Sequence, residues 1–534
     1  MQRIRIYAII LLIGLITVIS LYALLSSDKK GQKVIGSLLI LFAYLGGAYF
    51  FSPKWLYVLL VCTILVLPFL LYKFYNTRDT QGTKIILKHS KGQLEFFNAF
   101  VGWLVYGGAG SGKTASLGKP LLSEFMRNNF VFFIYDAKDN DYTNTAFWLK
   151  EELNYPYPIY NIDLVNLSNS YRFNPIKTKL ITDEMDVAEF FNNTYLLLAK
   201  KTTTTEWDDK AKGVLLASAY YIYYYHPEKF TYPHVLNFPL QLKGEKLTEL
   251  FEQNPTCRTF ASAFLDAKGS VATQSSIMST LSGVISSFAV NKKITYVLTG
   301  DDFDFYLNDP EEPKSFSITN SFQYRNQISP FVALLFVSAV KRIKFGNTVP
   351  MVGFLDEGTT FKIQDLEQYP SELREYLFAM VILTQNPSKI EKMYGKADLR
   401  SIESNLQNHF YGRTKDPEAA KKFSGMFAEI KERKKSYTVG KNQRKSVTTS
   451  TQDKEKYKPE FFKGLQVGRF VGSATESNVV EFDVRFKPYK GSKLSENPFV
   501  RMVTDEDIEN NYEKVINDIF EIYTNDVKSN AIKQ

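Results

Sequence analysis

The strongest constraint on the fold is a glycine-rich segment, residues 103–114, which reads WLVYGGAGSGKT. It fits the phosphate-loop pattern G-x-x-x-x-G-K-[ST]. An apolar stretch before it and a helical pattern over residues 115–127 supply the strand–loop–helix context that such a loop needs. Glycine lets the backbone turn tightly, so that consecutive N–H groups can face phosphate oxygens. We therefore predict that a nucleotide binds to Gly107, Gly108, Ala109, Gly110, Ser111, Gly112, Lys113 and Thr114.

Two side chains of this loop are expected to have separate tasks. Lys113 would neutralise the β- and γ-phosphates of ATP, and the hydroxyl of Thr114 would hold Mg²⁺. The helix that follows would direct the positive end of its dipole toward the same anion. The pattern therefore predicts ATP and Mg²⁺ as cofactors.

A second acidic site is expected where residues 351–357, MVGFLDE, form an apolar strand that ends in adjacent carboxylates. Asp356 would order Mg²⁺ through its water shell, and Glu357 would activate the attacking water. Asp-Glu pairs also occur at residues 183–184 and 505–506, but no apolar strand precedes them. Those two pairs are more typical of solvated or helix-capping positions.

Two further residues are candidates for the same site. Gln385 follows the apolar strand 378–384, and a polar amide there could sense the γ-phosphate. The alternative interpretation is that Gln385 is an ordinary residue of the turn after the strand. Arg374 lies on a helix predicted over residues 366–376, which should pack beside the site. It is either an arginine finger or the partner of Glu372 or Glu375 on a solvated face.

The order of the apolar segments predicts an α/β protein. Strand candidates at residues 130–135, 315–319, 351–355, 378–384 and 409–412 alternate with helical stretches such as 327–345, which favours a mostly parallel sheet with helices on both faces. Lys113 and Asp356 are 243 residues apart, too far for one minimal α/β core. The residues beyond those that such a core needs lie in 183–293. Helical patterns there, at 187–200, 208–225 and 271–289, predict an inserted all-helical domain. We therefore divide the nucleotide-binding domain into residues 76–182 and 294–489, and expect 490–534 to be a tail with one helix.

The N-terminus contains three apolar runs, at residues 7–25, 34–51 and 56–72. They are long enough to cross a bilayer, and we predict a transmembrane segment over residues 1–75, with three helices favoured over two. A signal peptide is the alternative, but the first run is long and lacks a cleavage pattern. Residues 1–75 carry seven cations and one acid, so they supply +6 of the net charge of +9. The positive-inside rule then places the bulk of the chain in the cytoplasm.

Other features exclude some functions. Two cysteines exclude a disulfide scaffold, and four scattered histidines lack metal-ligand spacing. Tyrosines over residues 220–225 favour an amphipathic core helix over base stacking. The basic residues 431–445 leave two possibilities open, contact with a phosphate backbone or a solvated, mobile loop.

Taken in order, the motifs resemble the type IV coupling protein family, the conjugative DNA-transfer ATPases of type IV secretion systems. The resemblance covers roughly residues 100–490 and follows the N-terminal membrane segment. Its motifs are the phosphate loop, YDAK at 135–138, FNP at 173–175, the helical insertion near Trp207, LDE at 355–357, TQ at 384–385, and MYG at 393–395 with Ile402 to Asn405.

This resemblance implies a RecA-like P-loop NTPase that works as a homo-hexamer, binds single-stranded DNA and a relaxase, and passes them to the secretion channel. It implies that Lys113, Thr114, Asp356, Glu357, Gln385 and Arg374 form the ATPase site, and that the helical insertion contacts the substrate. Two other functions stay open. A double-stranded DNA segregation motor normally ends in a winged-helix reader, for which residues 490–534 are too short, and an assembly scaffold would not need the water activator Glu357.

Overall fold

The computed structural model describes residues 84–533, apart from residues 139, 178–180, 182, 202–203, 322, 440–444, 490 and 492–497. The three membrane spans predicted in residues 1–75 lie outside the described residues. Within the described ranges, no helix is both long enough and apolar enough to span a bilayer.

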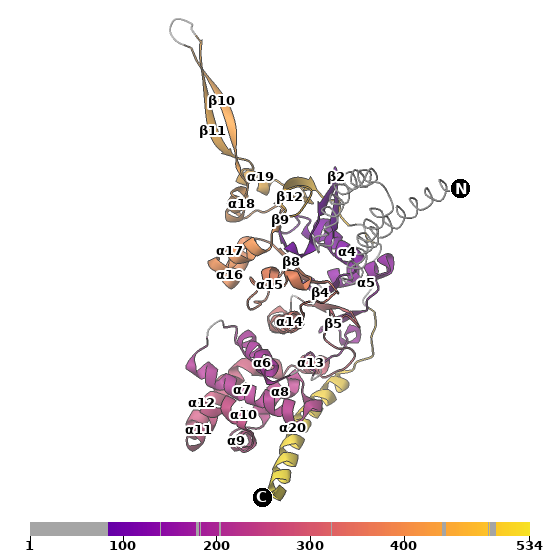
Figure 1. Ribbon diagram of the computed structural model, residues 1–534, viewed down its shortest axis with the longest axis vertical. Coiled ribbons are helices and arrows are strands. Elements are labelled where there is room, and N and C mark those ends of the chain that lie inside the picture. Colours follow the sequence, from indigo (N-terminus) through magenta and orange to yellow (C-terminus); the bar gives the residue numbers. More distant parts are fainter. Residues whose placement is uncertain are drawn as a thin grey trace, which may run out of the picture. The chain divides into compact units, whose positions relative to one another are not determined.

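A nine-stranded sheet with the order β13-β12-β9-β3-β8-β7-β4-β6-β5 organises the fold (Figure 1). The strands are β3 (Trp103–Tyr106), β4 (Val131–Asp136), β5 (Ile159–Asp163), β6 (Ser315–Thr319), β7 (Met351–Asp356), β8 (Phe378–Thr384), β9 (Asn408–Tyr411), β12 (Arg469–Ser473) and β13 (Glu481–Arg485). The strands from β9 to β5 pair in parallel, whereas β12 pairs antiparallel with β9 and β13. The predicted α/β class with a mostly parallel sheet is confirmed, and the antiparallel edge is an addition.

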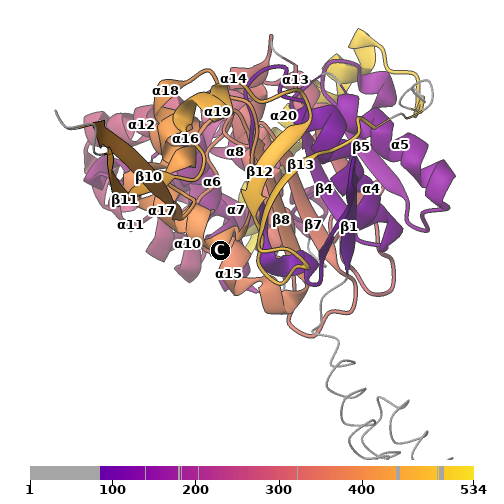
Figure 2. The same cartoon turned by 90° about the horizontal axis from the view of Figure 1, so that it is seen from above.

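The sheet is buried on both faces, which explains why its central strands are continuous apolar runs. Successive side chains of β3 point to opposite faces, so Trp103 and Val105 lie in one hydrophobic core and Leu104 and Tyr106 in the other. Figure 2 shows helices on the two sides of the strands. The first core is covered by β1 (Ile85–His89), β2 (Gly92–Phe96), α4 (Lys119–Arg127) and α5 (Asp141–Leu153), and the second by α14 (Arg325–Val340), α16 (Pro387–Tyr394), α17 (Lys396–Asn405), α18 (Pro417–Ser424) and α19 (Pro459–Lys463).

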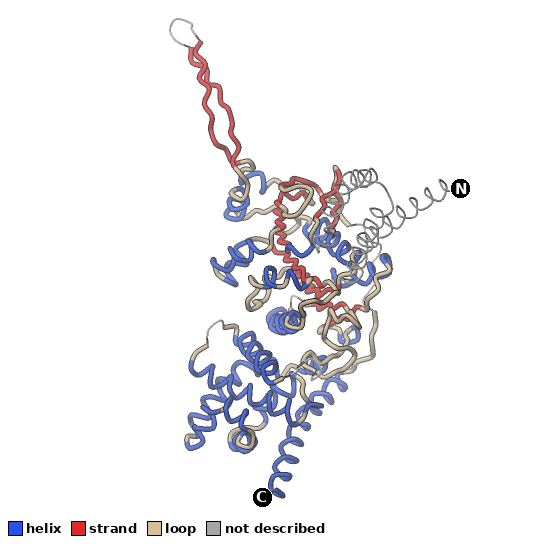
Figure 3. The backbone as a smooth tube through the Cα atoms, in the orientation of Figure 1, coloured by secondary structure: helices blue, strands red, loops and turns tan. Residues whose placement is uncertain are grey.

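A helical domain, residues 184–298, is inserted between β5 and β6 (Figure 3). Because β5 and β6 are neighbours in the sheet, the whole domain is one long crossover between two parallel strands. Its helices are α6 (Glu184–Ala199), α7 (Glu206–Tyr225), α8 (Tyr232–Gln241), α9 (Glu245–Phe251), α10 (Pro255–Phe260), α11 (Ser262–Asp266), α12 (Val271–Ala289) and α13 (Lys292–Leu298). A capping box between Thr205 and Asp208 starts α7, and Tyr220 and Tyr221 are buried on that helix, as a core helix requires.

The C-terminal helix α20 (Asp505–Lys533) is part of this helical domain's core. It packs against α8, α9 and α13, and it buries Val515, Ile519 and Ile522. The sequence pattern predicted a helix in residues 490–534, within a tail. It did not predict that this helix packs against α8, α9 and α13.

We expect the acidic side chains of α20 to stabilise this packing in a pH-dependent manner. Asp518 contacts His234 at 3.2 Å and Lys229 at 3.3 Å. Its hydrogen bond with His234 lowers the pKa of Asp518, and so does the positive charge of Lys229. An acid with a lowered pKa stabilises the fold above its unfolded pKa of about 3.9 and loses this effect as the pH falls. Asp518→Asn should therefore reduce the free energy of unfolding by about 1 kcal/mol at pH 7 and by less at pH 3, measured by urea unfolding. Glu513→Gln, an exposed position on the same helix, should leave it unchanged.

Residues 429–455 form a separate two-stranded antiparallel sheet. Strand β10 (Glu429–Val439) pairs with β11 (Lys445–Glu455) in one unbroken register, from Glu429 opposite Glu455 to Val439 opposite Lys445. The mobile-loop interpretation of the basic stretch is therefore wrong for residues 431–439, which are strand.

Candidate functional site

The phosphate loop leaves the centre of the sheet at the carboxyl end of β3. The Gly107 N–H donates to the Thr384 carbonyl at 3.1 Å, which ties the loop to the end of the neighbouring strand β8. Gly112 has φ +88°, and a Cβ there would lie 2.8 Å from the backbone nitrogen of Gly468, so only glycine fits. A single π-helical turn, η2 (Lys113–Gly118), follows and continues into α4.

The sheet order brings Lys113, Glu357 and Gln385 together, because β3, β8 and β7 are neighbours and their carboxyl ends share one edge. The Lys113 Nζ donates to Glu357 Oε1 at 2.9 Å, and both side chains are buried. Gln385 Nε2 donates to the same oxygen at 3.2 Å. These three predicted residues therefore converge, although Lys113 and Glu357 are 244 positions apart in the chain.

Glu357 has the features of a positioned base. Its φ of +47° is unusual for a residue other than glycine, and such strain concentrates at functional sites. Burial alone would raise the pKa of Glu357, but the charge of Lys113 and its hydrogen bond outweigh burial and lower this pKa. The carboxylate is therefore held ionised, in the form that can accept a proton from water.

Asp356 is completely buried beneath this edge, and it fits a role in holding a cation. Among the described residues, neither of its carboxylate oxygens has a hydrogen-bond partner, and the nearest cation is Lys138, with Nζ at 3.8 Å. Burial raises the pKa of Asp356 to about 7, so another positive charge nearby would favour its ionised form. Lys138 Nζ also donates to Thr114 Oγ1 at 3.3 Å, which places the two predicted Mg²⁺ residues around one ammonium group.

A cavity of about 360 Å³ opens above these side chains. Its walls are the phosphate loop and the residues at the ends of three strands: Gly107, Gly108, Ala109, Gly110, Ser111, Gly112, Lys113, Thr114, Ala115, Lys138, Glu357 and Gln385. In the described part of the chain there is no group of three or more His, Cys, Asp or Glu residues able to hold a metal.

Arg374 is not in this group, and the expectation that it packs beside the nucleotide site of its own chain needs correction. The predicted helix 366–376 is two short pieces, α15 (Tyr369–Glu372) and the 3₁₀ turn η7 (Arg374–Tyr376). Arg374 precedes β8 and Gln385 follows it, so the two lie at opposite ends of a seven-residue strand, about 20 Å apart. Its carboxylate partner is Glu476, not Glu372 or Glu375.

Three cations around the site were not among the residues predicted for it. Lys138 follows β4, Lys389 Nζ lies 3.7 Å from Glu357 Oε2, and Arg413 donates to the Gly110 carbonyl at 2.8 Å. Each of them comes shortly after a parallel strand. Their position shortly after a parallel strand could have predicted them from the sequence, because the carboxyl ends of these strands lie at the same sheet edge as the phosphate loop.

Similarity to known proteins extends over one segment of the chain by sequence and over most of the chain by fold. Residues 350–460, which begin at β7 and include the acidic pair, match the family model described as the TraM recognition site of TraD and TraG. The matching segment makes up about a fifth of the chain, 111 of its 534 residues. No curated protein sequence matches it.

Solved structures share the fold of this chain. The bacterial conjugative coupling protein TrwBdeltaN70, in its unbound monoclinic form, aligns with a TM-score of 0.59 and 14% identity, over 77% of this chain and 91% of TrwBdeltaN70. The plasmid coupling protein TrwB in complex with ADP and Mg²⁺ aligns with a TM-score of 0.58 and 14% identity, over 76% of this chain and 89% of the other. These matches show that most of the chain has the same fold as these coupling-protein structures.

Proposed function

We propose that this protein is a membrane-anchored ATPase that couples a relaxase-bound single-stranded DNA to a type IV secretion channel and drives conjugative transfer by ATP hydrolysis. The observation that carries this proposal is the convergence of Lys113, Glu357 and Gln385 on one cavity, in a chain whose residues 350–460 match a TraD and TraG family model. A protein that only held nucleotide would not need a buried, ionised carboxylate beside the phosphate loop.

The geometry supports a division of labour among these side chains. Lys113 would leave Glu357 for the incoming phosphates, because an ammonium ion forms charge-assisted hydrogen bonds with phosphate oxygens. Glu357, freed from that ion pair, would orient and deprotonate the attacking water, while Gln385 would bridge Glu357 and the γ-phosphate. Thr114 and Asp356 would hold Mg²⁺, which neutralises charge on the phosphates when bound. The loop backbone from Gly107 to Gly112 would position the triphosphate.

The surroundings of the motor belong to the same proposal. The apolar runs in residues 1–75 would anchor it in the bacterial inner membrane, with the bulk of the chain in the cytoplasm. Six copies would form the active ring, and the TraM recognition description of the matching family model supports a partner in the DNA-processing complex. The helical domain would contact the substrate.

The proposal is tested with the full-length protein in detergent micelles. ATP hydrolysis should require Mg²⁺, stop when EDTA removes it, and rise when single-stranded DNA is added. Turnover that is indifferent to DNA at every concentration would contradict the translocase and favour an assembly scaffold. Greater stimulation by duplex than by single-stranded DNA would favour a segregation motor.

A further inference from the structure

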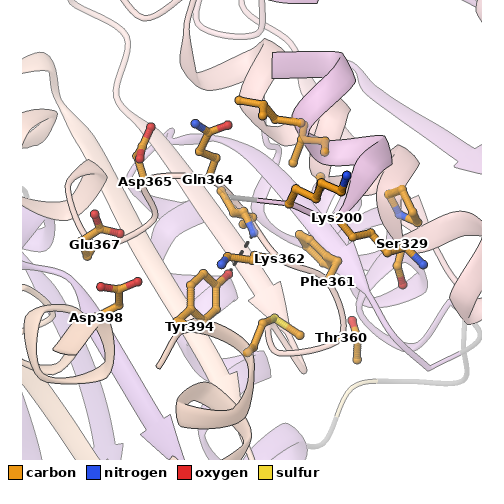
Figure 4. A pocket seen from close by; sticks show the side chains of 17 residues that line it. Lys200, Ser329, Thr360, Phe361, Lys362, Gln364, Asp365, Glu367, Tyr394 and Asp398 are labelled. Carbon is orange, nitrogen blue, oxygen red and sulfur yellow. Dashed lines mark hydrogen bonds between the residues drawn. The ribbon is translucent and has the colours of Figure 1, made fainter. Parts of the chain in front are cut away.

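A second pocket, of about 330 Å³, lies where the helical domain meets the sheet (Figure 4). It is formed by the end of α6, the start of α14, the loop after β7, and helices α16 and α17. No residue lines both this pocket and the phosphate-loop cavity. Its volume is within the range of pockets that bind small ligands.

The wall of this pocket contains aromatic side chains and buried polar atoms that have no hydrogen-bond partner among the described residues. Phe361, Met393 and Tyr394 contribute apolar surface. Among the described residues, Ser329 Oγ and Gln364 Oε1 are buried with no hydrogen-bond partner, and Ser329 is only 6% exposed. An unpaired buried polar atom costs about 1 to 3 kcal/mol, so a ligand with N–H donors would be favoured here.

Charge is arranged unevenly around the opening. Figure 4 shows Asp365, Glu367 and Asp398 on one side and Lys200 on the other, with Lys362 between them. Within the described part of the chain, neither Lys200 nor Lys362 forms an ion pair, and the Lys362 ammonium lies 5.8 Å from the centre of the Tyr394 ring. Neither ammonium group is therefore neutralised by a carboxylate, and both can meet an anion. The carboxylates on the far side would repel the same anion and thus fix the side on which it lies.

We propose that this pocket receives one base of single-stranded nucleic acid, with the flanking phosphates on Lys200 and Lys362. The exocyclic amino group of adenine or cytosine would donate to Gln364 and Ser329, and the ring would lie against the aromatic wall. This inference rests on the proposed function, because it names the surface through which the DNA substrate would act on the ATPase.

The position of the pocket supplies a route from DNA to hydrolysis. Its floor is the loop that begins directly after Glu357. Thr360 Oγ1 donates to the Tyr135 hydroxyl at 2.8 Å, and the Ile363 N–H donates to the Tyr394 hydroxyl at 3.0 Å. A base that contacts Phe361 and Lys362 would therefore press on this short loop, which the two hydrogen bonds hold in place. The other end of the loop is Glu357, the proposed general base.

The test measures ATP hydrolysis by the full-length protein with oligodeoxyadenylate and with an abasic oligomer of the same length. The wild type should be stimulated by oligodeoxyadenylate and much less by the abasic strand, which carries phosphates without bases. The Lys362→Ala, Gln364→Ala double variant should need about tenfold more oligodeoxyadenylate for half-maximal stimulation. Lys243→Ala removes an exposed lysine elsewhere on the helical domain and should behave as the wild type.

The possible failures can be told apart. Equal stimulation of the wild type and the double variant, or equal stimulation by the abasic and the normal strand, would overturn the base pocket and leave the proposed function intact. A wild type that hydrolyses ATP but never responds to DNA would overturn both.

Discussion

Replacing Lys113 by alanine is expected to lower the rate of ATP hydrolysis by at least about a hundredfold, because preorganised charge on the transferring phosphate is a major part of catalysis. Lys113 is buried beside the cavity, and no other lysine of the described chain lies as close to Glu357. Steady-state phosphate release by the purified protein measures the loss, and nucleotide binding should weaken with it.

The same variant should remain folded, since Glu357 keeps its hydrogen bond from Gln385 and its proximity to Lys389. Thermal unfolding and circular dichroism check this point. Lys88→Ala, at an exposed position on β1, is the matched control and should hydrolyse ATP at the wild-type rate. If Lys113→Ala retained a tenth or more of the wild-type rate, the phosphate loop would not be the hydrolytic site.

Replacing Glu357 by glutamine should lower the hydrolysis rate by about 10² to 10⁴-fold while ATP still binds. The amide keeps the shape of the side chain and can still meet Lys113 and Gln385, but it cannot accept a proton from water. Binding of a fluorescent ATP analogue should therefore be preserved, in contrast to Lys113→Ala. This difference in ATP binding would distinguish the role of Lys113, which is to bind the phosphates, from that of Glu357, which is to activate water.

Glu391→Gln, on the exposed face of α16, is the control for loss of a carboxylate and should have no effect. Hydrolysis by Glu357→Gln at close to the wild-type rate would show that water is activated elsewhere. Stable hexamers with bound ATP and slow turnover in the wild type would instead support the assembly scaffold.

Local patterns predicted most of the sheet and much of the site. The strands Ser315–Thr319 and Phe378–Thr384 have the predicted bounds, because parallel strands buried on both faces are short apolar runs that end in polar residues. The residues after three such runs, Lys113, Glu357 and Gln385, meet as expected from one rule, that carboxyl ends of parallel strands share an edge.

The same rule, fully applied, would have placed Arg374 away from the nucleotide site of its own chain. A residue that precedes β8 must lie at the opposite edge from one that follows it. The continuous helix expected there is interrupted at Leu373, whose φ of −93° and ψ of 3° are not helical, so only the short pieces α15 and η7 form. Strands β12 and β13 escaped notice because polar residues interrupt them, and the packing of α20 depends on contacts too distant in sequence to leave a local pattern.

The place of α20 also sets an order of events during biosynthesis. Tyr221 on α7 donates to Asp526, and this contact spans 305 positions of the chain. The ribosome therefore has to finish almost the whole polypeptide before the helices that were made first can close their apolar surface. Until then that surface is open to chaperones or to neighbouring nascent chains, and a protein truncated before residue 505 would never bury it.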